Sequence, residues 1–256
     1  MALRIIDIQK RYQTEIGHMK ILKRIENYYY RFQTELTRRW WNHFSGTSPF
    51  LCDVLMFHHV TDVYVDAIPS CRRTREEFRQ TLQKRIDAGV KFISMDEVNK
   101  LVHHGGKGSY ATVTFDDVPN NFLSDAYPIL KELQIPFTLF LTTSYLETPG
   151  YINLCDLETL TSEPLCTIGA HTVSHPMLRK VKNSYKEIAD SKKQLEDLIG
   201  SKVKYFAYPY GRPSSISNRV KRQARKAGFE IAFCTIFAPI NKVSVRNRYY
   251  LPRVID

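Results

Sequence analysis

The sequence predicts an α/β fold in which parallel strands alternate with helices. Three observations carry this prediction. From residue 50 onward, short apolar runs rich in β-branched residues recur, and helical segments with recognisable caps lie between them. The third observation is size, because 256 residues that are 43% hydrophobic can build one large core. Periodicity alone does not decide between a barrel and an open sheet.

The first 44 residues are expected to form an added helical segment. Its apolar side chains recur at gaps of three and four, which places them on one stripe: Ile8, Tyr12, Ile16, Met19, Leu22, Ile25, Tyr29, Phe32, Leu36 and Trp40. Gly17 lies within the stripe, so two helices fit as well as one. The run YYYRFQTELTRRWW interleaves aromatic and basic residues, which suits an interfacial helix on an anionic membrane. Packing on the body of the protein or on a second copy is the preferred alternative. Residues 45–48 (SGTS) are expected to end this 1–48 extension and to lead into a domain covering 49–256.

The elements of that domain are expected in the following order. The strands are Leu51–Phe57, Lys91–Ile93, Ala111–Phe115, Phe137–Leu141, Thr167–Ala170, Tyr205–Ala207 and Ile231–Thr235. Three helices begin with a capping box, a Ser or Thr followed three residues later by Glu: Thr74 with Glu77, Ser94 with Glu97, and Ser184 with Glu187. The first is expected to stop at Gly89 and the third at Gly200. A further helix near residues 218–227 carries five basic side chains and no acidic one.

The formal net charge of +11 is unevenly distributed. Residues 1–44 hold nine basic and four acidic side chains, residues 45–175 hold ten and sixteen, and residues 176–256 hold eighteen and six. Basic ends suit an anionic substrate or membrane surface, or a solvated face without a partner. Nucleic-acid binding is not expected, because net charge is the only feature of the sequence that favours it. The composition excludes collagen-like, disulfide-scaffold and wholly disordered chains, and no apolar run reaches the roughly 18 residues of a spanning helix.

The five cysteines indicate a reducing compartment. Cys52, Cys71, Cys155, Cys166 and Cys234 are odd in number and show no CxxC spacing, which is typical of reduced thiols. The start, MALRIIDIQKRYQTE, lacks the apolar stretch of a secretory signal. We therefore expect a cytoplasmic protein, with peripheral contact at the inner membrane face as an extension of that expectation.

Candidate chemistry follows two of the predicted strands, where parallel α/β folds place it. Asp116 and Asp117 come after the strand ATVTF, and adjacent carboxylates repel each other unless a cation is near. His171 and His175 follow the strand CTIGA at a spacing that suits one metal ion. Solvated turn acids and packed histidines are the alternatives. Together, one carboxylate and two imidazoles make a facial set for zinc, iron, cobalt or nickel, and the second Asp is free to act as a base.

A third element is YFAYPYGRP, in which Pro209 and Gly211 flank Tyr210 just past a strand. It is either a simple tight turn or a device that aims a backbone N–H at a developing oxyanion. The sequence contains neither a GKS/T phosphate loop nor a GxGxxG fingerprint, so a nucleotide-phosphate site of those kinds is not supported.

The ordered set TFDD (114–117), HTVSH (171–175) and YPYG (208–211) resembles the polysaccharide deacetylases of the NodB-homology type, carbohydrate esterase family 4. MFHHV (56–60) and YLPRV (250–254) extend the resemblance over about residues 50–253. It implies a distorted (β/α)7 barrel and a divalent metal, with zinc expected first and cobalt, nickel or iron as alternatives. The implied ligands are Asp117, His171 and His175, and Asp116 would be the general base. Tyr210, with Pro209 beside it, would hold the oxyanion during hydrolysis of an N-acetyl group on a hexosamine.

The sequence departs from the family pattern in three places. Val118 stands where the family usually has Gly. Ala207 stands where the family has an Arg that pairs with the catalytic Asp, a role that Arg253, grouped here with the substrate and oxyanion residues, could take over. No His follows His175, so the general-acid role of a late family His falls to His58, unless His58 is structural.

The resulting functional prediction is a metal-dependent N-deacetylase. Its expected substrate is an N-acetylhexosamine-containing glycan or a precursor, either a sugar nucleotide or a lipid-linked intermediate, because both carriers bear diphosphates that suit the basic ends. The alternative is a catalytically impaired carbohydrate-binding or assembly module on the same barrel. Hydrolysis of another amide or ester is a third reading, and the oligomeric state is left open.

Overall fold

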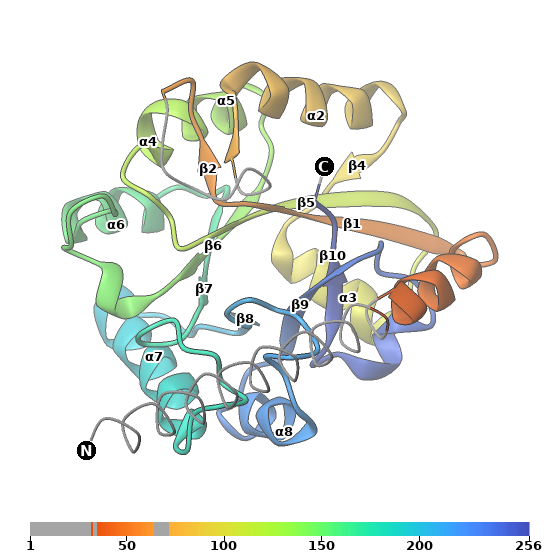
Figure 1. Cartoon of the computed structure of the whole chain (residues 1–256). Helices are drawn as coiled ribbons and strands as arrows, with labels where there is room; N and C mark the ends of the chain where they lie inside the picture. Colours follow the sequence, from red (N-terminus) through yellow and green to blue (C-terminus); the bar gives the residue numbers. More distant parts are fainter. Residues whose placement is uncertain (1–31, 33–34, 64–71, 256) are drawn as a thin grey trace, which may run out of the picture.

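A computed structural model describes Phe32 and residues 35–63 and 72–255. Its centre is a parallel sheet in the order β1-β5-β6-β7-β8-β9-β10, with β4 paired to β5 (Figure 1). The strands are β1 (Phe50–Phe57), β4 (Lys91–Phe92), β5 (Gly108–Asp116), β6 (Phe137–Leu141), β7 (Cys166–Ala170), β8 (Tyr205–Ala207), β9 (Ile231–Phe237) and β10 (Leu251–Arg253). A separate pair consists of β2 (His59–Val60) and β3 (Arg72–Arg73).

The two ends of this sheet meet, so the sheet nearly closes into a barrel. Val254 follows β10 and forms a parallel bridge with Leu55 of β1. The Met56 N–H donates to the Val254 carbonyl at 2.9 Å, and the Val254 N–H donates to the Val54 carbonyl at 2.8 Å. The predicted α/β class and the barrel implied by the family resemblance are therefore both confirmed.

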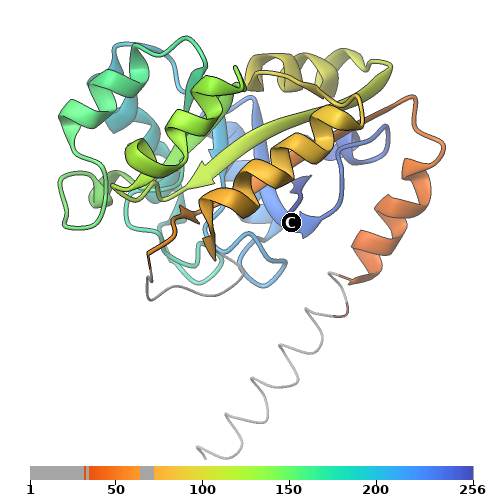
Figure 2. The same ribbon diagram turned by 90° about the horizontal axis from the view of Figure 1, so that it is seen from above.

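Helices cover the outside of the barrel, as the view in Figure 2 shows. They are α2 (Arg75–Asp87), α3 (Met95–His104), α4 (Phe122–Asp125), α5 (Tyr127–Glu132), α6 (Leu154–Thr161), α7 (Ser184–Ile199) and α8 (Asn218–Lys226), with 3-10 turns η2 (Thr143–Tyr145) and η3 (Ser244–Asn247). The capping boxes of α2 and α3 are confirmed, with Thr74 and Ser94 as caps. The box at Ser184 is wrong, because Ser184 is the first helical residue and Glu187 binds elsewhere.

The side chains of the strands alternate between two apolar clusters, so both faces of the sheet are buried. On β9, Phe233 belongs to one cluster, whereas its neighbours Ala232 and Cys234 belong to the other. On β6, Phe140 and Leu141 are divided in the same way. Runs that are buried on both faces read as continuous apolar stretches, which is why they were visible in the sequence.

The described part of the N-terminal segment is helical over residues 35–45 and packs on the barrel. Trp41 is buried, and its carbonyl accepts a hydrogen bond of 2.9 Å from Asn241 Nδ2. The same amide contacts Ser45 Oγ at 3.1 Å. Packing on the body of the protein, the preferred expectation, therefore holds for these residues. The predicted stripe from Ile8 to Tyr29, and Gly17 within it, lie outside the described residues.

No helix among the described residues is both long enough and apolar enough to cross a bilayer. Four cysteines, Cys52, Cys155, Cys166 and Cys234, are free thiols, whereas Cys71 is outside the described part of the chain.

Candidate active site

Asp116 ends β5 and forms a buried ion pair with Arg253, the last residue of β10. The guanidinium donates to both carboxylate oxygens, each at 2.6 Å, in the two-pronged geometry that makes such pairs strong. Burial alone would raise the pKa of Asp116. The charge of Arg253, helped by the nearby His171, outweighs burial and holds the pKa well below its usual range.

The pair of Arg253 and Asp116 replaces the contact that the family pattern assigns to an arginine at position 207, where this chain has Ala207. Ala207 ends β8 and is fully buried, so no guanidinium can come from there. Arg253 reaches Asp116 from β10 instead, and its Nε donates to the Cys234 carbonyl at 3.2 Å. The predicted contact between Arg253 and Asp116 is thus present, although Arg253 itself is fully buried beneath the carboxylate.

The three predicted metal ligands come together at the carboxyl ends of β5 and β7. Asp117, His171 and His175 each offer one ligand atom, and these atoms lie within 4.8 Å of one another. His175 Nε2 is 3.7 Å from Asp117 Oδ2. One carboxylate oxygen and two imidazole nitrogens at this spacing fit a divalent metal of the zinc type. Asp117 is available as a ligand because Arg253 pairs with Asp116 and not with Asp117.

His171 is oriented for coordination by a hydrogen bond to the backbone. Its Nδ1 lies 2.8 Å from the carbonyl of Ala207, so a proton on Nδ1 leaves Nε2 free to bind a metal. Burial lowers the pKa of His171, against the opposing effect of Asp116 and Asp117, and so favours the neutral ring that a ligand requires. Thr142 Oγ1 donates to Asp117 Oδ1 at 2.9 Å and fixes the carboxylate.

His175 is held between aromatic rings. The ring of Tyr145 stacks on it at 6.2 Å, and the ring of Tyr210 meets it edge-on at 4.9 Å. Tyr145 in turn packs on Tyr151 at 4.5 Å. Burial and the charge of Asp117 raise the pKa of Tyr145 to about 12, so its hydroxyl stays protonated at neutral pH.

The backbone of the site is strained. Seven non-glycine residues of the described chain have positive φ, and five of them lie in these loops: Asp117, Val118, Thr172, His175 and Tyr210. A β-branched residue such as Val118, at φ 49°, seldom adopts this conformation. Its place in the family pattern usually belongs to Gly, for which the conformation carries no penalty. Strain of this kind persists only where the surrounding structure holds it, and it clusters at functional sites.

Glu187 provides part of that support. Its Oε2 accepts hydrogen bonds from the N–H groups of Val173 and Ser174, at 3.1 and 3.0 Å, and its Oε1 accepts from Ser174 Oγ at 2.9 Å. The carboxylate therefore ties α7 to the loop that carries both histidines. This is the physical reason why Glu187 does not cap its own helix.

The Tyr208–Gly211 turn presents the backbone of Tyr210 to the site. Pro209 is buried, and the N–H of Tyr210 donates to no acceptor among the described residues. Gly211 has φ 59°, and a Cβ on it would lie 2.7 Å from the backbone nitrogen of Thr235, so only glycine fits there. The close approach to β9 fixes where the Tyr210 N–H points.

His58 and His59 follow β1 beside the same site. In the parallel pair of β1 and β5, Phe57 lies opposite Phe115, so His58 and Asp116 follow at the same end of neighbouring strands. The charge of His58 contributes to the low pKa of Asp116. Burial, together with His58, lowers the pKa of His59, and the charge of Asp117 opposes that change. The structure thus brings every predicted site residue to one end of the barrel.

Three supporting residues were not predicted: Thr142, Tyr145 and Glu187. Thr142 directly follows the strand Phe137–Leu141, so inspection of that strand end would have found it. Tyr145 lies in η2, and no spacing in the sequence links it to His175. Glu187 was assigned to a capping box because the local pattern fits one.

Comparison with known proteins agrees with this geometry. The polysaccharide deacetylase family model matches residues 104–232, and the chain belongs to this family.

The poly-beta-1,6-N-acetyl-D-glucosamine N-deacetylase of Staphylococcus aureus (strain MRSA252) is 26% identical over 204 residues, which are 71% of this chain and 67% of that enzyme. YxkH of Bacillus subtilis is 24% identical over 73% of this chain and 65% of its own length, so the chain spans about two thirds of these relatives. Among solved structures, IcaB from Ammonifex degensii is 26% identical, with a TM-score of 0.65 over 80% of this chain and 91% of IcaB.

Proposed function

We propose that this protein is a metal-dependent N-deacetylase that hydrolyses the N-acetyl group of an N-acetylhexosamine in a glycan or glycan precursor. The observation that carries the proposal is the convergence of Asp117, His171 and His175 beside an Asp116 that Arg253 keeps ionised. When bound, a divalent metal would polarise the acetyl carbonyl and make a water molecule more acidic.

The residues of the chain divide the remaining work. Asp116 accepts the proton of the attacking water, because it stays a carboxylate at working pH. The Tyr210 N–H donates to the oxyanion that forms when the water oxygen bonds to the acetyl carbon. His58 donates a proton to the departing amine as the C–N bond breaks, and acetate is released. Arg253 acts through Asp116 as a positioning residue, since burial keeps it from a substrate.

The substrate and the location belong to the same proposal. The name of the Staphylococcus aureus relative makes β-1,6-linked N-acetylglucosamine oligomers the first candidates, and the basic ends of the chain support a diphosphate-bearing carrier as the second. Zinc is the first metal to test. A cytoplasmic location, with peripheral contact at the inner membrane face, stays a prediction.

Acetate release tests the proposal. The chain is stripped with a chelator, reloaded with zinc or cobalt, and assayed on N-acetylglucosamine oligomers and on a sugar nucleotide. We expect acetate from at least one of them, and we expect His58→Gln to reduce turnover more than metal content. Failure on every acetylated sugar despite bound metal would favour the binding-module alternative. The binding-module alternative rested on the missing family arginine at position 207 and on the missing late histidine. Arg253 takes the place of that arginine beside Asp116.

A further inference from the structure

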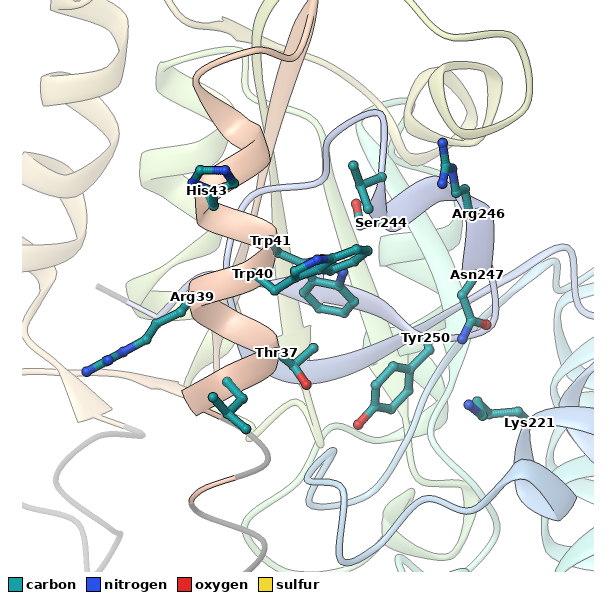
Figure 3. A pocket seen from close by; sticks show the side chains of 12 residues that line it. Thr37, Arg39, Trp40, Trp41, His43, Lys221, Ser244, Arg246, Asn247 and Tyr250 are labelled. Atoms are coloured by element: carbon teal, nitrogen blue, oxygen red, sulfur yellow. The ribbon is translucent and has the colours of Figure 1, made fainter.

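A groove lies between the helix of residues 35–45 and the segment that precedes β10, away from the metal ligands. It has a volume of about 980 Å³. Its walls include Leu36, Trp40, Lys221, Val243, Arg246 and Tyr250. Figure 3 shows the Trp40 and Trp41 rings projecting from the helix towards η3, with Lys221 and Tyr250 across from them and Arg39 pointing away.

The groove combines cations with an apolar surface, and none of the described residues that line it is acidic. Lys221 is half-buried, and its ammonium lies 4.9 Å from the centre of the Tyr250 ring. Burial lowers the pKa of this lysine, and no described carboxylate forms an ion pair with it. A partly desolvated cation without an acid is favourably placed to bind an anion.

The apolar part continues along the helix. Phe32, Leu36 and Trp40 are 53%, 49% and 50% exposed, and their spacing of four places them along one side of the helix. Glu35 pairs with both Arg38 and Arg39, so the unpaired positive charge is concentrated at Lys221 and Arg246. A small soluble anion would use those cations and leave the aromatic stripe in water.

We propose that this groove docks the protein on the surface of an anionic phospholipid bilayer. A lipid phosphate lies between Lys221 and Arg246, and the side chains of Leu36 and Trp40 enter the interfacial layer. Tryptophan is favoured there because its ring is apolar and its N–H can remain hydrated. A basic rim around an apolar stripe is the pattern of interfacial helices.

The position of the groove agrees with a docking role. Tyr250 directly precedes β10, and Arg253 at the other end of β10 contacts Asp116. The groove and the metal ligands therefore lie towards opposite ends of the barrel. A surface bound at the groove leaves the strand ends with Asp117, His171 and His175 open to a glycan.

Co-sedimentation of the full chain with vesicles tests the proposal. Vesicles of phosphatidylcholine alone are compared with vesicles that contain phosphatidylglycerol. We expect binding only to the anionic vesicles, and the double variant Lys221→Gln with Arg246→Gln should bind at least tenfold less, since each basic side chain near an anionic leaflet contributes about fivefold. Trp40→Ala should also weaken binding. The matched control is Lys84→Gln with Lys193→Gln, which removes two exposed cations outside the groove and should bind like the wild type.

Three outcomes would overturn the proposal. The first is a wild type that does not sediment with anionic vesicles. The second is binding that survives both groove variants, which would assign it to another part of the chain. The third is a dimer in sedimentation velocity that Trp40→Ala dissociates, which would assign the groove to a second copy. Thermal melts confirm that each variant is folded. Asp116→Asn should bind vesicles like the wild type, so docking and hydrolysis can fail separately.

Discussion

Arg253 shows how a missing residue can be replaced from another strand. The guanidinium that the family pattern places at position 207 reaches Asp116 from β10, where a fully buried side chain makes two bonds of 2.6 Å. From the sequence, this substitution could be stated only as a hypothesis, because nothing in the spacing of Asp116 and Arg253 shows that β10 lies beside the rest of the site. The near closure of the barrel brings them together.

Arg253→Lys should lower kcat by about a hundredfold or more. A single ammonium cannot replace a bidentate guanidinium, and a misplaced Asp116 no longer contributes general-base catalysis. Metal affinity should change little, since Asp117 is not a partner of Arg253. Both are measured on the same preparation, by steady-state acetate release and by metal titration. An unchanged kcat would show that Asp116 needs no such partner.

Thr142→Val should weaken metal binding about tenfold, because it removes the hydrogen bond that orients Asp117 while keeping the shape of the side chain. Titration calorimetry with zinc or cobalt measures this directly. Thr143→Val is the control, since the Thr143 hydroxyl bonds to Gln194 on α7 and not to a ligand. Equal affinities for the two variants would exclude a role for Thr142 in holding the ligand.

At the scale of elements, the strands were the most predictable part. Burial on both faces produces apolar runs that none of the described helices shows, and β6 and β8 were predicted to the residue. The two-residue strands β2 and β3 were not found, because they are too short to show a period. The cap of α6 was missed for another reason. Its reciprocal box is formed by Asn153 and Asp156, which differ from the pattern of a Ser or Thr followed by a Glu.

Glu187→Ala should destabilise the fold by about 1–3 kcal/mol, because three donors of the histidine loop lose a charged acceptor. Metal affinity should fall as well, since the loop carries His171 and His175. Denaturant unfolding and metal titration separate the two effects. Glu196→Ala is matched to it on the same helix, because Glu196 accepts from the Val203 N–H far from the ligands. Only the unfolding free energy should change in that control.

For the whole molecule, the position of charge proved more informative than its total. The predicted ligands and the base all lie in the net-acidic middle of the sequence, and the fold gathers them at one end of the barrel. The basic C-terminal part supplies Arg253 to the site and Lys221 and Arg246 to the groove at the other end. The order of the motifs in the sequence was sufficient to predict that the ligands and the base lie together. The groove depends on how the helix of residues 35–45 packs, and no sequence period encodes that.

Removal of the metal should lower the thermal stability of the whole chain. A ligand at a hundred times its Kd stabilises the native state by about 2.7 kcal/mol, provided that the unfolded chain does not bind it. For a chain of this size we expect chelation to shift Tm down by roughly 5–10 °C. Differential scanning calorimetry with and without chelator measures the shift. A Tm that ignores both chelator and added zinc would indicate that no metal binds the folded chain.

The central claim is that Asp116 serves the chemistry whereas Asp117 serves the metal. Metal content and acetate release, measured together on the wild type, Asp116→Asn and Asp117→Asn, test it most directly. We predict that Asp116→Asn retains its metal and releases no acetate, and that Asp117→Asn loses both. Acetate release by Asp116→Asn at the wild-type rate, or full metal binding by Asp117→Asn, would contradict the account.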